Sequence, residues 1–165
     1  MRIVSITLAL LSVLSVLAVS GASRAEDPSF LALGVGYYDL LHDADSAEFR
    51  LEYRDKHRWW LFKPFAGITA TTDAAVFAYA GVLTDFYFGR RIVVTPSVAP
   101  GAYSRGNGKD LGHTFEIRSG LEVAYRFDNR GRLGLLFYHI SNAGLGDDRN
   151  PGAEVLSLTY ALPLN

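Results

Sequence analysis

Apolar and polar side chains alternate along most of the chain after residue 26. Between Phe115 and Phe127 the odd positions are mostly apolar or aromatic, and the even positions are charged or small. The segment from Ala47 to Arg54 has the same pattern, with Ala, Phe, Leu and Tyr alternating with Glu and Arg. Successive side chains of a β-strand point to opposite faces of its sheet. Each such segment is therefore predicted to be a strand with one apolar and one charged face.

Eight segments can be marked in this way, at about the length that a strand needs to cross a membrane. They run over 29–39, 47–54, 59–70, 75–86, 91–99, 114–127, 132–140 and 153–162. Short turns such as 55–58 and 128–131 alternate with mostly longer connections such as 100–113 and 141–152. Outer-membrane barrels combine short periplasmic turns, longer outer loops and an even number of strands. The pattern predicts an all-β protein, an eight-stranded antiparallel transmembrane β-barrel over residues 26–165.

The N-terminus has a different pattern. Arg2 precedes a mainly apolar run from Ile3 to Val19, and Ser23-Arg24-Ala25 has the form of a cleavage site. We expect residues 1–25 to be a signal peptide rather than an uncleaved anchor, because the run is marginally short for a membrane helix. No later stretch approaches that length, so the exported chain is predicted to be a soluble protein or an outer-membrane barrel.

Composition and charge narrow these classes. The 165 residues include 16 Lys and Arg against 17 Asp and Glu, a formal charge of −1 at pH 7, which gives no electrostatic reason to expect nucleic acid as a partner. The absence of Cys excludes a disulfide framework and thiolate metal sites. A lipocalin-like carrier needs an apolar interior, which the charged faces of 47–54 and 114–127 do not provide. A barrel of eight strands is filled by its own side chains, which argues against a pore.

Three reactive side chains interrupt the apolar face of the last two predicted strands. His139 and Ser141 continue the apolar face of 132–140, and Glu154 continues that of 153–162. An ionisable side chain that faces lipid is costly and marks a candidate functional site. A serine hydroxyl needs an imidazole to take its proton, and the imidazole needs a carboxylate to fix its tautomer. These residues can therefore supply a nucleophile, a base and an orienting acid; the alternative is a polar strand end at the level of the lipid headgroups.

The stretch His139-Ile140-Ser141-Asn142-Ala143-Gly144, with Asn150-Pro151-Gly152-Ala153-Glu154 after it, resembles the C-terminal signature of the PagL-type lipid A 3-O-deacylases. This resemblance implies an outer-membrane barrel that hydrolyses the 3-O-linked acyl ester of lipid A in lipopolysaccharide and releases a 3-hydroxy fatty acid. It implies a catalytic triad of His139, Ser141 and Glu154, with an oxyanion hole formed by the backbone N–H groups of Asn142 and Gly144. No cofactor and no metal are implied.

Other interpretations stay open at this point. A non-catalytic small outer-membrane barrel with a structural or adhesive role is the alternative to an esterase, and a homodimer is compatible with the sequence. Two acidic groups could hold a divalent ion, although solvated loops explain them more simply; they are His42 with Asp43 and Asp45, and Asp147 with Asp148. Three cations in the expected outer loops could pair with lipid A phosphates; they are Arg105, Lys109 and Arg149.

Overall fold

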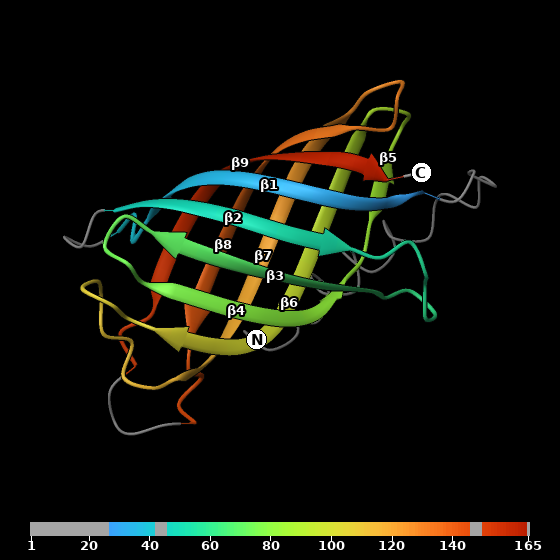
Figure 1. The fold of residues 1–165 in the computed structure, drawn as a ribbon. Helices are drawn as coiled ribbons and strands as arrows, with labels where there is room; N and C mark the ends of the chain where they lie inside the picture. The colour runs from blue at the N-terminus through green and yellow to red at the C-terminus, as the bar shows by residue number, and fades with distance from the viewer. Residues whose placement is uncertain (1–26, 42–45, 146–149, 165) are drawn as a thin grey trace, which may run out of the picture.

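The computed structural model describes residues 27–41, 46–145 and 150–164. Nine strands lie within these ranges: β1 (Ser29–Tyr38), β2 (Ser46–Arg54), β3 (Lys63–Thr71), β4 (Val76–Leu83), β5 (Phe86–Phe88), β6 (Ile92–Ser104), β7 (Phe115–Arg126), β8 (Arg132–Ser141) and β9 (Ala153–Leu164). All pairings are antiparallel, and the sheet closes because β4 pairs with β6 (Figure 1). None of the described residues forms a helix of the length and apolarity needed to span a bilayer. The predicted signal peptide, residues 1–25, lies outside the described residues.

The short β5 and its predecessor β4 occupy one position in the barrel wall. Both pair with β6, and the register is the same on either side of the gap, with Leu83 opposite Ser97 and Phe86 opposite Val94. Between these pairs lies Pro96 of β6, which has no N–H to donate to the neighbouring strand. The ladder is therefore interrupted without any slip of register. Counted by wall positions, the predicted eight-stranded antiparallel barrel is confirmed.

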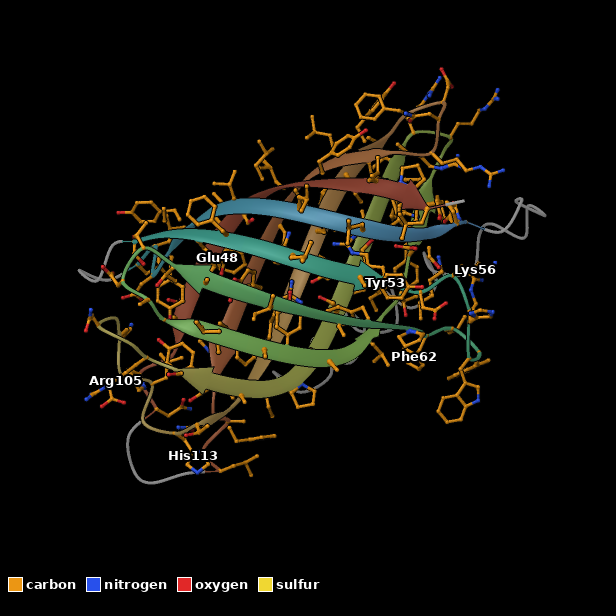
Figure 2. The ribbon with its side chains drawn as sticks, viewed as in Figure 1. Glu48, Tyr53, Lys56, Phe62, Arg105 and His113 are labelled. Carbon is orange, nitrogen blue, oxygen red and sulfur yellow. The ribbon has the colours of Figure 1, made fainter. Side chains whose placement is uncertain are left out.

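Polar and apolar side chains separate between the lumen and the outer surface, as the alternation predicts. On β2 the charged side chains from Glu48 to Arg54 are buried in the lumen, whereas the alternate residues from Phe49 to Tyr53 are exposed on the outside (Figure 2). Along β7, β8 and β9 the outward face is likewise mainly apolar, whereas the inward face of β8 and β9 also carries apolar residues such as Leu136, Ile140 and Val155. An outward apolar band is the surface that a transmembrane barrel presents to lipid.

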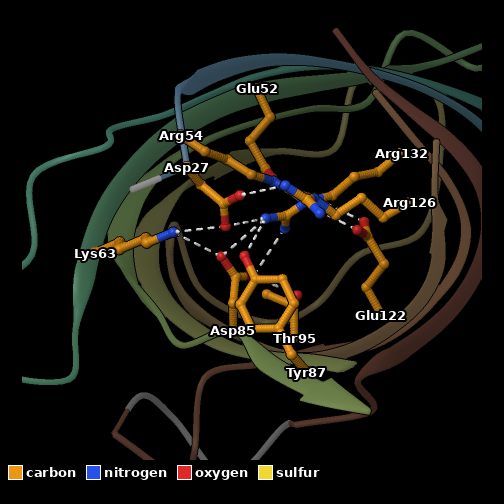
Figure 3. A network of polar contacts seen from close by, with 10 residues as sticks. All are labelled: Asp27, Glu52, Arg54, Lys63, Asp85, Tyr87, Thr95, Glu122, Arg126 and Arg132. Carbon is orange, nitrogen blue, oxygen red and sulfur yellow. Dashed lines mark hydrogen bonds and ion pairs between the residues drawn. The ribbon is translucent and has the colours of Figure 1, made fainter. Parts of the chain in front are cut away.

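Buried ion pairs tie the strands together at the end of the lumen where β1 begins and β9 ends. Arg132 lies 2.8 Å from Asp27 and 3.0 Å from Asp85, and Arg54 binds Glu122 through both terminal nitrogens at 2.9 and 2.7 Å (Figure 3). Buried charges of this kind are tolerated only when each has a partner in good geometry. The network joins strands on opposite sides of the lumen, since Arg54 of β2 binds Glu122 of β7.

One predicted strand begins later than expected. The alternation suggested a strand from residue 59, but Trp59 and Phe62 instead pair with each other in a tight turn, and β3 begins at Lys63. A strand sends every second side chain into the lumen. The ion network already fills the lumen at this level, so the apolar side chains of 59–62 have no place inside it.

Candidate active site

His139 and Glu154 face each other directly across β8 and β9. The two residues are partners in the strand register, and Nδ1 of His139 lies 3.0 Å from Oε1 of Glu154. An ionised carboxylate can only accept hydrogen bonds, so Nδ1 donates and Nε2 is left as the proton acceptor of the ring. The imidazole is 39% exposed on the outer wall, while the carboxylate beneath it is 16% exposed. This is the pairing in which a carboxylate orients a general base.

Ser141 is the last residue of β8 and lies on the same face as His139. Residues two apart on a strand have Cα atoms about 6.5–7 Å apart, which brings their side chains within reach of each other. The hydrogen bonds of the described residues do not include one between Ser141 and His139. Rotation about the Cα–Cβ bond moves Oγ between staggered positions, and catalytic hydrogen bonds often tighten only in the substrate complex.

A second serine lies beside the imidazole. Ser119 of β7 is the register partner of His139 on the side away from Glu154, and it is exposed on the outer wall. The Cβ atoms of such directly paired residues are about 4.5–5.5 Å apart. Glu154, His139 and Ser119 therefore form a row across three neighbouring strands. The sequence analysis missed Ser119 because only the pairing of β7 with β8 brings it to the site.

A strained turn follows β8 immediately after Ser141. The N–H of Leu145 donates to the carbonyl of Asn142 at 2.9 Å, and the two central residues have positive φ, 52° at Ala143 and 71° at Gly144. Positive φ at both central residues is the geometry of a type I′ turn. Glycine adopts it readily, but alanine does so at a cost that the surrounding structure must offset. Backbone strain of this kind concentrates at functional sites.

The backbone N–H groups of this turn differ in whether they already donate a hydrogen bond within the protein. The N–H of Asn142 donates to Oδ1 of Asn150 at 3.1 Å, and the N–H of Gly144 donates to Oδ1 of Asn142 at 2.9 Å. Both groups assigned to the oxyanion hole are thus engaged within the loop in this structure. The N–H of Ala143 lies between them, and no acceptor for it is found among the described residues. Asn150, which fixes the start of the turn, was quoted in the signature but given no role from sequence.

Comparison with known proteins decides the family. The family model for lipid A 3-O-deacylase (PagL) matches residues 31–163, a range that contains the whole candidate site. This chain belongs to the PagL family of lipid A 3-O-deacylases. The family, the hydrolase class and the outer-membrane location predicted from the sequence are thereby confirmed. A search of curated protein sequences found no match.

Two solved structures show the same fold as this PagL-family chain. The crystal structure of the outer membrane enzyme PagL has a TM-score of 0.65 at 21% identity, and the alignment covers 82% of this chain and 99% of that one. A structure from the de novo design of transmembrane β-barrels has a TM-score of 0.60 at 10% identity, covering 87% of this chain and 100% of the designed one. At these identities both structures show the fold of this chain alone.

In this PagL-family barrel the backbone at Gly152 fits closely against the imidazole of His139. Gly152 has a φ of 62°, and a Cβ atom built there would lie 2.6 Å from Cε1 and 3.2 Å from Nε2 of His139. Both the backbone conformation and the contact therefore require glycine. The ring atoms Cε1 and Nε2 therefore lie next to this glycine, while Nδ1 binds Glu154. The loop after the turn thus helps to hold the imidazole in place.

Two of the remaining candidates from the sequence, Arg105 and Lys109, lie at the same end of the barrel. Arg105 pairs with Asp110 at 3.1 Å and lines an open cavity of about 530 Å³ with His113 (Figure 2). Lys109 is held by Asp39 at 2.6 Å. Within the described ranges no group of three His, Cys, Asp or Glu residues is placed to hold a metal ion. Six of the residues proposed for ions or phosphates lie outside the described residues, namely His42, Asp43, Asp45, Asp147, Asp148 and Arg149.

Proposed function

We propose that this protein hydrolyses the 3-O-linked acyl ester of lipid A at the outer leaflet, with Ser141 as nucleophile, His139 as base and Glu154 as orienting acid. The observation that carries the proposal is the hydrogen bond between His139 and Glu154 on the outer wall. It lies at the end of the barrel with the longer connections, which in outer-membrane barrels is the extracellular end. A lipid in that leaflet lies against this part of the wall, so its acyl ester reaches the imidazole without entering the filled lumen.

The proposed reaction has two steps. Nε2 of His139 takes the proton of Ser141 as Oγ attacks the ester carbonyl carbon, and the sugar 3-oxygen then leaves with that proton. This forms an acyl-serine and releases the 3-hydroxyl of the sugar. In the second step His139 takes a proton from water, the resulting hydroxide attacks the acyl carbon, and Ser141 is regenerated with release of a 3-hydroxy fatty acid. Glu154 stabilises the imidazolium that forms in both steps.

The turn after β8 supplies the donors for the oxyanion. We assign this role to the N–H groups of Asn142 and Gly144, which must exchange their present acceptors, Asn150 and the Asn142 side chain, for the oxyanion. The N–H of Ala143 has no acceptor among the described residues, so none of these has to be exchanged for the oxyanion. A single donor of this kind is commonly worth about 3–4 kcal/mol in the transition state. The strained backbone at Ala143 supports the assignment, because it is what directs these N–H groups.

Mass spectrometry of lipid A tests the proposed reaction. Cells whose outer membrane carries the folded protein are expected to contain lipid A lighter by one 3-hydroxyacyl group, and the released fatty acid should appear as the free acid. An inert barrel would leave the lipid A mass unchanged although the heat-modifiable gel mobility showed it to be folded. Loss of an acyl group from a position other than 3 would refute the proposed regiochemistry.

Replacing Gly152 by alanine is expected to lower deacylation by about 10²-fold, because a displacement of the base by about 1 Å has effects of that size. The added Cβ must push His139 away from its place beside Glu154. Gly89→Ala is the matched control, since Gly89 also has positive φ, 66°, but a Cβ there meets nothing within 4 Å. Equal activities of the two folded variants would show that Gly152 does not position the imidazole.

A further inference from the structure

The connection between β2 and β3 presents four large apolar side chains to the surroundings. In this segment, Trp59–Phe62, which we call the tryptophan turn, Trp59 is 86% exposed and Trp60 is 78% exposed. Leu61 and Phe62 are also exposed. Water-soluble surfaces seldom gather such side chains in one place unless they bind something. The turn lies at the end of the barrel opposite the candidate active site.

The backbone of the tryptophan turn is built to display these side chains. The N–H of Trp59 donates to the carbonyl of Phe62 at 2.8 Å, and the N–H of Phe62 donates back at 3.0 Å. Trp60 has a φ of 58°, a conformation that is unfavourable for a bulky residue and is normally left to Gly or Asn. Trp60 has this strained backbone although its indole is hardly buried inside the protein. An environment outside the protein that favours exposed indoles would account for it.

Positive charge adjoins the tryptophan turn. Lys56 and Arg58, which lead into it, are exposed. The carboxylate of Asp55 is occupied locally, since it accepts from the backbone N–H of His57 at 2.8 Å and lies 2.7 Å from Nδ1 of that ring. The cations are therefore the charges that this segment offers to a partner. A partner that is apolar and carries negative charge at its boundary fits this combination.

The tryptophan turn also continues the lipid-facing wall. Tyr53, the last outward-facing residue of β2, is exposed, and Figure 2 shows Tyr53, Lys56 and Phe62 at the same end of the barrel. In Figure 3 the teal connection that leads from β2 to Lys63 is drawn outside the ring of strands. The exposed indoles are thus placed beside the barrel, where the inner leaflet of the membrane lies.

We propose that the tryptophan turn binds the inner leaflet of the outer membrane, with the indoles at headgroup level and Lys56 and Arg58 on the phosphates of anionic phospholipids. Trp is enriched at membrane interfaces because its ring is apolar and its N–H is polar. Basic residues next to the membrane are attracted to anionic lipids. A two-fold contact with a second copy is disfavoured, since it brings the same cations together. This anchor does not depend on the proposed catalysis.

Tryptophan fluorescence can test this proposal directly, because the two Trp residues of the chain are Trp59 and Trp60. The full-length barrel is reconstituted into phosphatidylcholine vesicles with and without phosphatidylglycerol. Emission is expected to shift to the blue relative to the unfolded chain. Lipids brominated near the headgroup should quench it more than lipids brominated at the chain end. Acrylamide quenching should fall several-fold relative to the unfolded chain, and further when phosphatidylglycerol is present.

Charge variants test whether Lys56 and Arg58 bind the anionic lipid. Lys56→Glu with Arg58→Glu is expected to abolish the difference between the two kinds of vesicle. Arg90→Glu is the matched control, because Arg90 is an exposed cation in another turn at the same end, and it should leave the difference unchanged. An equal effect of both changes, or no difference between vesicles with the wild-type chain, would refute binding to anionic lipid.

Two further outcomes would refute the proposed position of the tryptophan turn at the inner leaflet. Strong acrylamide quenching without quenching by brominated lipid would place the turn in water. Protection from both quenchers would mean that protein covers the turn, including a second copy of this chain. Trp59→Phe and Trp60→Phe each leave one reporter, so the measurement survives if one of these variants fails to fold. Heat-modifiable mobility identifies the folded samples.

Discussion

Ser141→Ala is expected to lower lipid A deacylation on the order of 10⁶-fold, the scale measured when a serine nucleophile is removed from a hydrolase triad. The hydroxyl is at the end of β8 on the outer wall, so its loss leaves no cavity in the lumen. We therefore expect the variant to keep its heat-modifiable mobility and its β-sheet circular dichroism. The measurement is the amount of 3-hydroxy fatty acid released from purified lipopolysaccharide by equal quantities of folded protein.

Ser119→Ala is the matched control for this prediction. Ser119 and Ser141 are both outward-facing neighbours of His139, one across the β7–β8 ladder and one along β8. Only Ser141 adjoins the strained turn that carries the proposed oxyanion donors, so Ser119→Ala should retain activity within a few-fold of the wild type. The reverse result, an inactive Ser119→Ala beside an active Ser141→Ala, would assign the nucleophile to Ser119 and refute the triad.

Glu154→Gln is expected to lower kcat by about 10⁴-fold, the effect of the equivalent acid-to-amide change in a serine hydrolase. The amide keeps the shape of the side chain but removes the charge that stabilises the imidazolium. Its NH₂ group can also donate to Nδ1, which moves the ring proton to Nε2 and leaves no base for Ser141. Single-turnover release of fatty acid would measure the loss in the acylation step.

Glu116→Gln is the control for Glu154→Gln, because it also removes a carboxylate at the same end of the barrel. Glu116 is the second residue of β7, at the same end of the barrel as the candidate active site, but it points into the lumen, where it is completely buried. It cannot reach a lipid on the outer wall, so its replacement should leave deacylation nearly unchanged. If Glu154→Gln were as active as Glu116→Gln, the bond to His139 would be structural, and the base would have to be oriented by another group.

The sequence determined which side of the wall each strand residue occupies. Alternation is a local property, since neighbouring side chains of a strand must point to opposite faces. His139 and Ser141 could for this reason be placed on one outward face without any knowledge of strand pairing. Glu48 and the other charged residues of β2 could likewise be placed in the lumen. The same local rule fails at 59–62, where every residue is apolar and a turn forms instead.

The arrangement across strands was decided by the tertiary structure alone. Which residue lies beside His139 depends on the register of β7, β8 and β9, and register is set by the whole sheet and its turns. Ser119 therefore could not be found from the chain, and the contact of Gly152 with the imidazole depends on how the loop folds back. The sequence specified the chemical groups and their faces, because those follow from the local backbone. Their distances followed from the closure of the barrel, which brings distant residues together.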